Sequence, residues 1–356
     1  MKSEQRIRAF IRLGLILNKV QTSDYETYIL DSLSQSEGFA FQSLKDACLQ
    51  STHRNPWFTV DSVYHAIEGI SKMLSEEALN NWVSDYSLIN VSPKKVAVIL
   101  AGNIPAVGFH DFLCVLISGH HFLGKLSSSD SVLLPAISNL LIAIEPAFEP
   151  RITFMEGMIC GFDAVIATGS NNSSRYFDYY FGKYPNIIRS NRNSIAVLTG
   201  NETEIQLKAL AEDVFSYFGL GCRNVSLLFV PDSYDFSPML DVFSKRFDAT
   251  LYSKYMNNYE YNKALFLINQ TPHFDNGSVL LRQDAGFNTP VSVLHYQYYS
   301  DLDSVLSSIE INKALIQCVV SDSEHIERSI PFGQTQYPSA LDYADGLDTM
   351  KFLLSI

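Results

Sequence analysis

The segment from residue 96 to residue 129 constrains the fold more than any other part of the chain. It begins with a β-branched run at 96–100, turns at Ala101-Gly102-Asn103-Ile104-Pro105, continues as a helical pattern to Gly119 and ends in a second apolar run at 122–126. β-Branched runs of this length favour strands, and apolar residues three and four apart favour a helix. The segment therefore predicts a strand–helix–strand unit of the kind that builds parallel sheets.

The same alternation continues to about residue 320. Residues 1–90 look helical, with patterns at 25–49 and 59–74 and a helix start at Ser75. The α/β fold expected from this order is a parallel sheet with helices on both faces. Because 356 residues are many for a single core, we place a domain boundary near Gly200. Further strands are expected at 152–155, 164–168, 195–198, 225–230, 279–281, 291–296 and 315–320, and further helices at 130–144, after Gly169, and at 202–218, 238–247 and 302–309.

Composition excludes several classes of protein. The net charge of −12 argues against nucleic acid or an anionic membrane as the main partner. Five cysteines without a C-x-x-C pair make a disulfide framework or a zinc cage unexpected, and Cys114 and Cys160 lie in apolar runs that suit an interior. The apolar run at 13–17 is too short for a signal peptide, and no stretch reaches the ~20 apolar residues of a membrane span. We expect a cytoplasmic protein whose first helix docks on its own body, with no metal site.

Ligands of open α/β sheets bind beyond the carboxyl ends of the strands. Asn103 and Lys125 each follow an expected strand, and Lys125 with Ser127 could reach a ribose or a phosphate. Gly169 and Ser170 open a helix and could offer N–H groups to a pyrophosphate. The usual G-x-G-x-x-G fingerprint is absent. A local excess of basic residues either suits a phosphate-bearing ligand or forms a solvated face; it comprises Arg175, Lys183, Arg189 and Arg192.

Cys222 is the candidate nucleophile. It follows Gly219-Leu220-Gly221 at a turn, where backbone N–H groups can point at a developing oxyanion. Arg223 could favour the thiolate, which is the reactive form of cysteine, and Asn103 could donate its amide to the same oxyanion. The alternatives are a buried, inert thiol at Cys222 and an ordinary turn residue at Asn103.

Taken together, these motifs resemble those of the aldehyde dehydrogenase superfamily, and within it the acyl-CoA reductase (LuxC-type fatty-acyl reductase) family. Asn103-Ile104-Pro105 is similar to the Asn-x-Pro turn whose Asn helps to hold the oxyanion. Gly124-Lys125-Leu126-Ser127 is similar to the segment whose Lys contacts the cofactor ribose, with Leu126 where Pro is usual. Thr168-Gly169-Ser170 resembles the phosphate turn, and residues 219–222 resemble the Gly-Gln-x-Cys of the catalytic cysteine. The resemblance covers about residues 95–320.

Two departures bear on the reaction. The superfamily members that oxidise aldehydes carry a Glu that activates water, whereas residues 188–194 of this chain contain no carboxylate. An enzyme that reduces an acyl thioester gains nothing from activated water, which would destroy the intermediate. The family's Glu-x-Phe-Gly-Pro motif, which binds the ribose, is not recognisable around residues 283–290. Asp284 would have to take the place of its Glu.

The resemblance implies an aldehyde dehydrogenase-like fold with a Rossmann-type cofactor domain and a smaller catalytic domain. Residues 1–200 would form the helical layer and the dinucleotide-binding domain, which 325–356 could complete, and residues 201–324 would carry the cysteine. The implied activity is reduction of an acyl-CoA or acyl-protein thioester to an aldehyde, with NADPH or NADH as cofactor and Cys222 and Asn103 as catalytic residues. Homo-oligomerisation stays open. Two alternatives keep the scaffold: an acyl phosphate reductase, against which the aromatic run at 176–184 mildly favours a longer apolar acyl group, and a non-catalytic binding partner.

Overall fold

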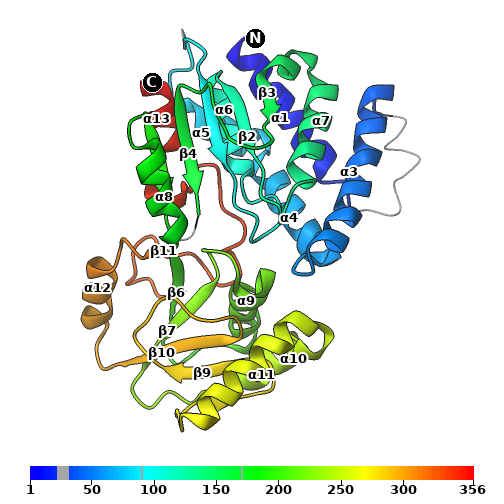
Figure 1. Cartoon of the computed structure of the whole chain (residues 1–356). Coiled ribbons are helices and arrows are strands. Elements are labelled where there is room, and N and C mark those ends of the chain that lie inside the picture. Colours follow the sequence, from blue (N-terminus) through cyan, green and yellow to red (C-terminus); the bar gives the residue numbers. More distant parts are fainter. Residues whose placement is uncertain (22–31, 90, 170) are drawn as a thin grey trace. The chain divides into compact units, whose positions relative to one another are not determined.

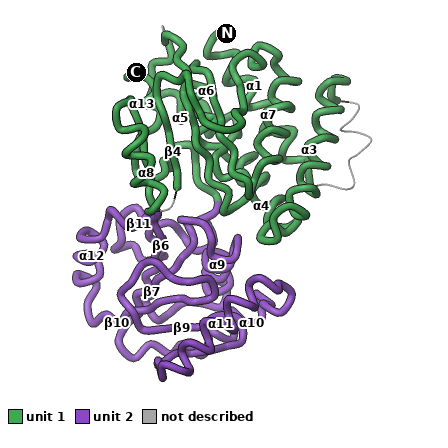
Figure 2. Tube along the Cα trace, in the orientation of Figure 1, with its two compact units in different colours: residues 1–190, 337–356 green, residues 191–336 purple. Residues whose placement is uncertain are grey.

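The computed structural model describes residues 1–21, 32–89, 91–169 and 171–356. These residues form two compact units (Figure 2). Unit 1 comprises Met1–Ser190 and Tyr337–Ile356, and unit 2 comprises Asn191–Gln336. The assignment of a cofactor role to the N-terminal part and a catalytic role to residues 201–324 stays a prediction, and each unit is described by itself.

Unit 1 contains a five-stranded sheet with the order β3-β2-β1-β4-β5. All its strands run parallel, and Val96 of the central strand lies opposite Phe122 on one side and Ala164 on the other. The structure thus confirms the expected strand–helix–strand unit and the parallel sheet. The strands are β1 (Lys95–Ile99), β2 (His121–Lys125), β3 (Ile152–Phe154), β4 (Ala164–Thr168) and β5 (Asn186–Arg189).

Side-chain alternation along β1 explains why helices cover both faces of this sheet. Val96 and Val98 enter the large core that is shared with α1 (Ser3–Leu17), α6 (Phe109–Ser118) and α7 (Leu133–Ile144). Ala97 enters a smaller cluster on the other face, where α8 (Asn171–Phe181) contributes Phe177 and Phe181 (Figure 1).

The N-terminal helices of unit 1 begin at side-chain caps. Thr59 caps α4 (Val60–Met73), and Ser75 caps α5 (Glu76–Ser84), as expected. α1 docks on the core through buried residues such as Phe10 and Leu13, which confirms that expectation. The helix expected at 25–49 is wrong in its bounds: α3 spans Gln35–Arg54, because Ser34 and Glu37 form a capping box there. Residues 25–31 of that expectation lie outside the described part of the chain.

The last twenty residues return to unit 1 and end in α13 (Thr349–Ser355). The imidazole of His110 hydrogen-bonds the Ala340 carbonyl at 2.9 Å, and the Trp82 indole donates to the Tyr343 hydroxyl at 2.7 Å. The tail therefore packs against the helices of unit 1. The described residues also form four 3₁₀ segments: η2 (Pro146–Arg151), η3 (Ser216–Gly219), η4 (Ala249–Leu251) and η5 (Ala344–Gly346).

Unit 2 contains a six-stranded sheet with the order β11-β6-β7-β10-β9-β8. The strands are parallel except for the short β8, which is antiparallel to β9. α9 and α10 pack on the face that carries Leu228, and α12 packs on the face that carries Leu227. The elements are β6 (Asn193–Val197), α9 (Glu204–Phe215), β7 (Val225–Pro231), α10 (Ser237–Arg246), α11 (Ser253–Ile268), β8 (Phe274–Asp275), β9 (Leu280–Gln283), β10 (Val293–Tyr299), α12 (Leu302–Ile311) and β11 (Ile316–Val320).

Among the described helices and strands, three were not expected from the sequence, namely strands β5 and β8 and helix α11. The helix expected at 202–218 ends earlier, since α9 stops at Phe215 and the next residues leave helical geometry. No helix among the described residues is long and apolar enough to cross a membrane.

Candidate active site

Three of the expected site residues lie at one edge of the unit 1 sheet. Asn103 follows β1, Lys125 ends β2 and Gly169 follows β4. These three strands are parallel neighbours in the order β2-β1-β4, so their carboxyl ends meet at the same edge. The structure therefore brings these residues to the kind of edge where open α/β sheets bind ligands.

The loop that carries Asn103 is fixed by a buried carboxylate. Asp130 accepts hydrogen bonds from the backbone N–H of Ala106 at 2.8 Å and from that of Leu133 at 3.4 Å. Burial raises the pKa of Asp130, although its backbone donors act in the opposite direction. Ala106 itself has φ +51°, a left-handed geometry that a non-glycine residue rarely adopts. Asp130 thus positions the turn that presents the exposed Asn103.

Lys125 and Ser127 lie at the same edge with different surroundings. The Lys125 ammonium donates to the Gly157 carbonyl, and an ammonium has three N–H groups, so this bond still leaves donors for a ligand. The Ser127 hydroxyl accepts from the Ser129 N–H at 3.2 Å. A Cβ on Gly102 would lie 2.6 Å from the Ser127 Oγ, so only glycine lets the Asn103 loop pass this closely. Ser127 therefore has a local structural role beside any contact with a ligand.

Gly169 lets the turn after β4 pack tightly against α8. A Cβ at this position would lie 2.8 Å from the Ser173 Cβ and 2.9 Å from the Phe177 ring. Ser170, the second residue expected to bind phosphate, lies outside the described residues. The aromatic run in α8 divides between two environments. Phe177 and Phe181 pack on the sheet, whereas three tyrosines are exposed, namely Tyr176, Tyr179 and Tyr180.

Arg189 corrects the idea of a basic stretch that is available to a phosphate. Its side chain is buried and forms a bidentate ion pair with Asp111, with N···O distances of 2.6 and 2.9 Å. Nη2 also donates to the Thr349 hydroxyl at 2.9 Å. Burial lowers the pKa of Arg189, but the Asp111 carboxylate outweighs this and leaves it above its ordinary value. This guanidinium therefore joins β5, α6 and the C-terminal helix.

Cys222 is exposed, at a turn that precedes β7 in unit 2. The alternative of a buried thiol at Cys222 is therefore wrong. The chain approaches it through three consecutive left-handed residues: Tyr217 with φ +52°, Phe218 with φ +60° and Gly219 with φ +75°. Left-handed geometry is strained for Tyr and Phe, and such strain clusters at functional sites. Cys160, in contrast to the expectation of an interior position, is also exposed, whereas Cys114 is buried.

Asn224 holds the turn around Cys222. Its side-chain oxygen accepts from the Gly221 N–H at 2.8 Å, and its amide donates to the Ser216 carbonyl at 2.8 Å and to the Asp213 carbonyl at 3.1 Å. The Gly221 N–H is thus committed within the turn, so the oxyanion donor expected from the glycines cannot come from Gly221. Asn224 was not singled out in the sequence, and its position two residues after the cysteine gave no signal of this role.

Ser194 and Cys318 lie beside the Cys222 backbone. The Ser194 hydroxyl donates to the Cys222 carbonyl at 3.0 Å, and the Cys318 sulfur lies 2.9 Å from the same hydroxyl oxygen. Ser194 belongs to β6 and Cys318 to β11, where the register shifts between Ile316 and Val319. The sequence motifs contained neither residue, because both lie far along the chain from the cysteine turn.

Asp213 anchors the end of unit 2 behind this turn. Its carboxylate accepts from the Gly333 N–H at 2.6 Å and from the N–H and hydroxyl of Thr335 at 3.1 and 2.8 Å. Burial raises its pKa to about 6, although these donors act in the opposite direction. The Arg223 guanidinium, expected to favour the thiolate, donates through Nε to the Thr335 carbonyl.

Comparison of the whole chain with known proteins gives a fold. No protein-family model matches the sequence, and no curated protein matches it. Among solved structures, aldehyde dehydrogenase 21 from Physcomitrella patens with bound succinate is similar with a TM-score of 0.64 and 11% identity, over 100% of this chain and 84% of that one. An E. coli NADP-dependent enzyme matches at TM-score 0.61 and 12% identity, over 86% of this chain and 70% of that one.

A third similar structure is the P. syringae indole-3-acetaldehyde dehydrogenase in complex with NAD⁺ and IAA. It has a TM-score of 0.60 and 14% identity, over 86% of this chain and 69% of that one. At such identities the likeness concerns the backbone arrangement. This chain has the aldehyde dehydrogenase-like fold, with a Rossmann-type parallel sheet and a second α/β sheet.

Proposed function

We propose that this chain is an NAD(P)H-dependent reductase that converts an acyl thioester, from acyl-CoA or an acylated protein, into an aldehyde through an acyl-enzyme at Cys222. The observation that carries the proposal is the exposed thiol of Cys222, on a strained turn that Asn224 holds in place. The aldehyde dehydrogenase-like fold supports the class of chemistry, an oxidoreduction at the level of an aldehyde. A nucleophilic thiol divides such a reaction into acyl transfer and reduction.

The residues near the end of β5 support reduction as the direction of the reaction. Residues 188–194 contain no carboxylate that could activate water, and Arg189 is committed to Asp111 and Thr349. An acyl-enzyme at Cys222 would therefore meet no carboxylate base from this segment. This favours reduction of the acyl group over its hydrolysis to an acid.

The carboxyl edge of the unit 1 sheet fits the ribose and phosphate part of a nicotinamide dinucleotide. The Lys125 ammonium ends β2 and keeps donors beyond its bond to Gly157. Gly169 brings the start of α8 close to the end of β4, and the N-terminus of a helix favours an anion. Bound there, the cofactor would supply the hydride that reduces the acyl group. NADPH and NADH both remain compatible with these residues.

The protein groups have distinct tasks in this proposal. The Cys222 thiolate attacks the thioester carbonyl, and the donor thiol leaves with a proton to give the acyl-enzyme. The Asn103 amide donates to the oxyanion of the tetrahedral intermediate.

Acyl trapping by intact-protein mass spectrometry tests the nucleophile. Acyl-CoA added without cofactor should raise the mass by one acyl group, and Cys222→Ala should abolish this adduct. Cys160→Ala is the matched control, because Cys160 is also exposed but lies in unit 1. We expect Asn103→Ala to lower the reduction rate by about 10²–10³ if its amide binds the oxyanion. An adduct of undiminished yield in Cys222→Ala would refute the proposed intermediate.

A fluorescence titration with NADPH and NADH tests the cofactor separately. Quenching or a spectral shift that saturates is expected in both the wild type and Cys222→Ala. If neither cofactor binds, the reductase proposal fails and a non-catalytic role on the same scaffold is favoured. Turnover of an acyl phosphate but not of acyl-CoA would favour the alternative of an acyl phosphate reductase, which uses the same cysteine with another acyl donor.

A further inference from the structure

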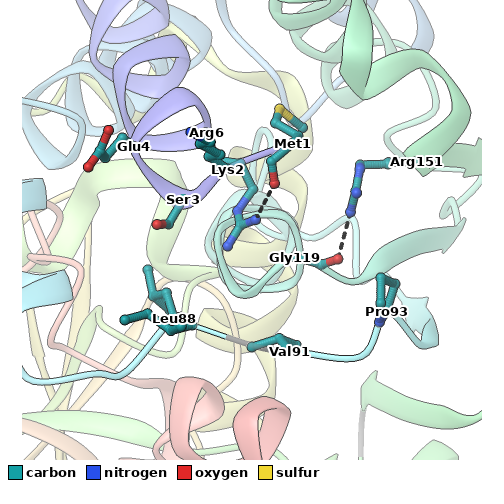
Figure 3. A pocket seen from close by; sticks show the side chains of 11 residues that line it. Met1, Lys2, Ser3, Glu4, Arg6, Leu88, Val91, Pro93, Gly119 and Arg151 are labelled. Carbon is teal, nitrogen blue, oxygen red and sulfur yellow. Dashed lines mark hydrogen bonds between the residues drawn. The ribbon is translucent and has the colours of Figure 1, made fainter.

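A pocket of about 440 Å³ lies at the edge of the unit 1 sheet opposite to Asn103 and Lys125. Three residues that line it each stand just before a strand: Pro93 before β1, Gly119 before β2 and Arg151 before β3 (Figure 3). Since these strands are parallel, the pocket is at their amino ends and the candidate active-site residues are at their carboxyl ends. Its volume is in the range of small-molecule sites.

The buried guanidinium of Arg6 belongs to this pocket. Arg6 lies in α1 and is 5% exposed. Its Nε donates to the Ile117 carbonyl at 2.9 Å, and its Nη1 donates to the Met1 carbonyl at 3.0 Å. Its Nη2 is buried and makes no hydrogen bond among the described residues. Buried polar groups are almost always hydrogen-bonded, so this atom requires an explanation.

A second guanidinium approaches the first at Gly119. Arg151 donates to the Gly119 carbonyl at 2.6 Å, and a Cβ on Gly119 would lie 3.2 Å from the Arg6 Nη1. Gly119 has φ +100°, so glycine suits this position for its backbone as well as for the close approach of Arg6. Burial and then the charge of Arg151 lower the pKa of Arg6. Two like charges thus share one small region.

Among the described residues, no carboxylate pairs with Arg6 or Arg151. Within the described part of the chain, neither arginine forms an ion pair, and the carbonyls that they contact are neutral. Glu4 lines the pocket, but its carboxylate points away from the Arg6 guanidinium (Figure 3). Lys2 adds a further positive charge to the lining. In a protein of net charge −12, such a local excess of positive charge is unusual.

Capping of helix α6 accounts for only part of this arrangement. The carbonyls of Ile117 and Gly119 belong to the C-terminal end of α6, where cations are favourable. One guanidinium would satisfy this need. Capping explains neither the orphaned Nη2 nor the second arginine next to a buried first one.

We propose that this pocket binds a small oxyanion of the phosphate type between Arg6 and Arg151. The anion accepts from the Arg6 Nη2 and neutralises both guanidiniums, in the charge-assisted geometry that arginine offers to phosphate. Met1, Lys2 and Ser3 line the same pocket, and Met1 is bonded to the neighbouring Nη1. A shift of this segment gives the anion access to Nη2. The proposal does not depend on the reductase activity.

Isothermal titration calorimetry with inorganic phosphate, at constant ionic strength set by chloride, tests the site. The wild type should bind phosphate saturably, and Arg151→Gln should weaken that binding at least tenfold, while its amide can still donate to Gly119. Arg8→Gln is the control for charge: Arg8 lies on α1, the helix of Arg6, but it is exposed and outside the pocket, and its Nε donates to the Glu4 carbonyl. This variant removes one positive charge, as Arg151→Gln does, and should change the affinity less than twofold.

Thermal unfolding in the same buffers provides a second readout. Phosphate should raise the Tm of the wild type and of Arg8→Gln by similar amounts, and should raise that of Arg151→Gln by less. Absence of saturable phosphate binding to the wild type would overturn the proposal. Equal loss of affinity in Arg8→Gln and Arg151→Gln would also overturn it, because the effect would then be one of net charge alone.

Discussion

Each unit contains a buried carboxylate on a helix that helps to hold the C-terminal segment of that unit. The two carboxylates do so through different kinds of partner. In unit 1, Asp111 of α6 faces the Arg189 guanidinium, which also contacts Thr349 near the C-terminus. In unit 2, Asp213 of α9 faces only N–H and O–H groups, those of Gly333 and Thr335. The first carboxylate has a full counter-charge and the second has none.

This difference sets what each contact costs to break. A charge whose buried partner is removed remains in a medium that solvates it poorly, so the loss is large. A buried carboxylate without a counter-charge can instead take up a proton, because burial raises the pKa of Asp213 to about 6 although its neutral donors act in the opposite direction. The unit 1 contact should therefore be strong and insensitive to mild acid, and the unit 2 contact should be weaker and dependent on pH.

The largest effect is expected from breaking the ion pair in unit 1. Arg189→Met leaves Asp111 buried and unpaired, and should lower the free energy of unfolding by about 3–5 kcal/mol. Urea unfolding followed by circular dichroism measures this. The double variant Asp111→Leu with Arg189→Met should regain most of the loss, since it buries no charge. A single variant as stable as the wild type would show that the pair is not the stronger of the two contacts.

The contact in unit 2 should cost less to disrupt. Asp213→Asn places an amide N–H₂ opposite one of the backbone donors, and should lower the free energy of unfolding by about 1–3 kcal/mol. Asp322→Asn, at an exposed carboxylate of the same unit, is the control and should stay within about 0.5 kcal/mol of the wild type.

The stability of the wild type and of Asp213→Asn should also depend differently on pH. The pKa of Asp213 is higher in the folded protein, so the folded state binds the extra proton between about pH 4 and pH 6. The contribution of Asp213 to stability is therefore greatest below about pH 4 and falls by on the order of 3 kcal/mol as the pH rises to about 6. The difference between wild type and Asp213→Asn isolates it. A difference that grows with pH over this range would have the wrong sign.

The smallest loss of stability is expected from an exposed contact of the C-terminal segment, residues 337–356. Lys72 lies 3.6 Å above the Tyr337 ring and pairs with Glu68 at 2.8 Å, and its side chain is 54% exposed. Lys72→Met should change the free energy of unfolding by at most about 1 kcal/mol, because solvent screens exposed pairs. Urea unfolding in low and high salt tests this. A loss comparable to that of Arg189→Met would contradict the ranking by burial.

The sequence predicted the sheet of unit 1 well because its strands and helices have clear periodicity. It missed α11, in which polar Asn and Tyr residues interrupt the apolar spacing between Tyr255 and Phe266. It also missed β5, whose four residues form an edge strand too short for a periodic signal. Local patterns determine long elements and leave short ones to tertiary contacts.

The candidate site divides in a similar way. Cys222 and Lys125 could be proposed as site residues because motif residues surround them in the chain. Arg189 was assigned a surface role in error, since its partner Asp111 lies 78 residues away and charge counting cannot identify a pair. The left-handed geometry at Tyr217 and Phe218 gave no signal either, because neither residue type favours it.

The discontinuity of unit 1 has a consequence for synthesis on the ribosome. Its first 190 residues emerge early, yet Ala340, Met350 and Leu353 of the same hydrophobic core are translated last, after all of unit 2. Until then, the surface that receives them is exposed to chaperones and proteases, while unit 2 already has its whole sequence. Nascent chains arrested before residue 337 should accordingly be cut by protease within residues 1–190 sooner than within 191–336.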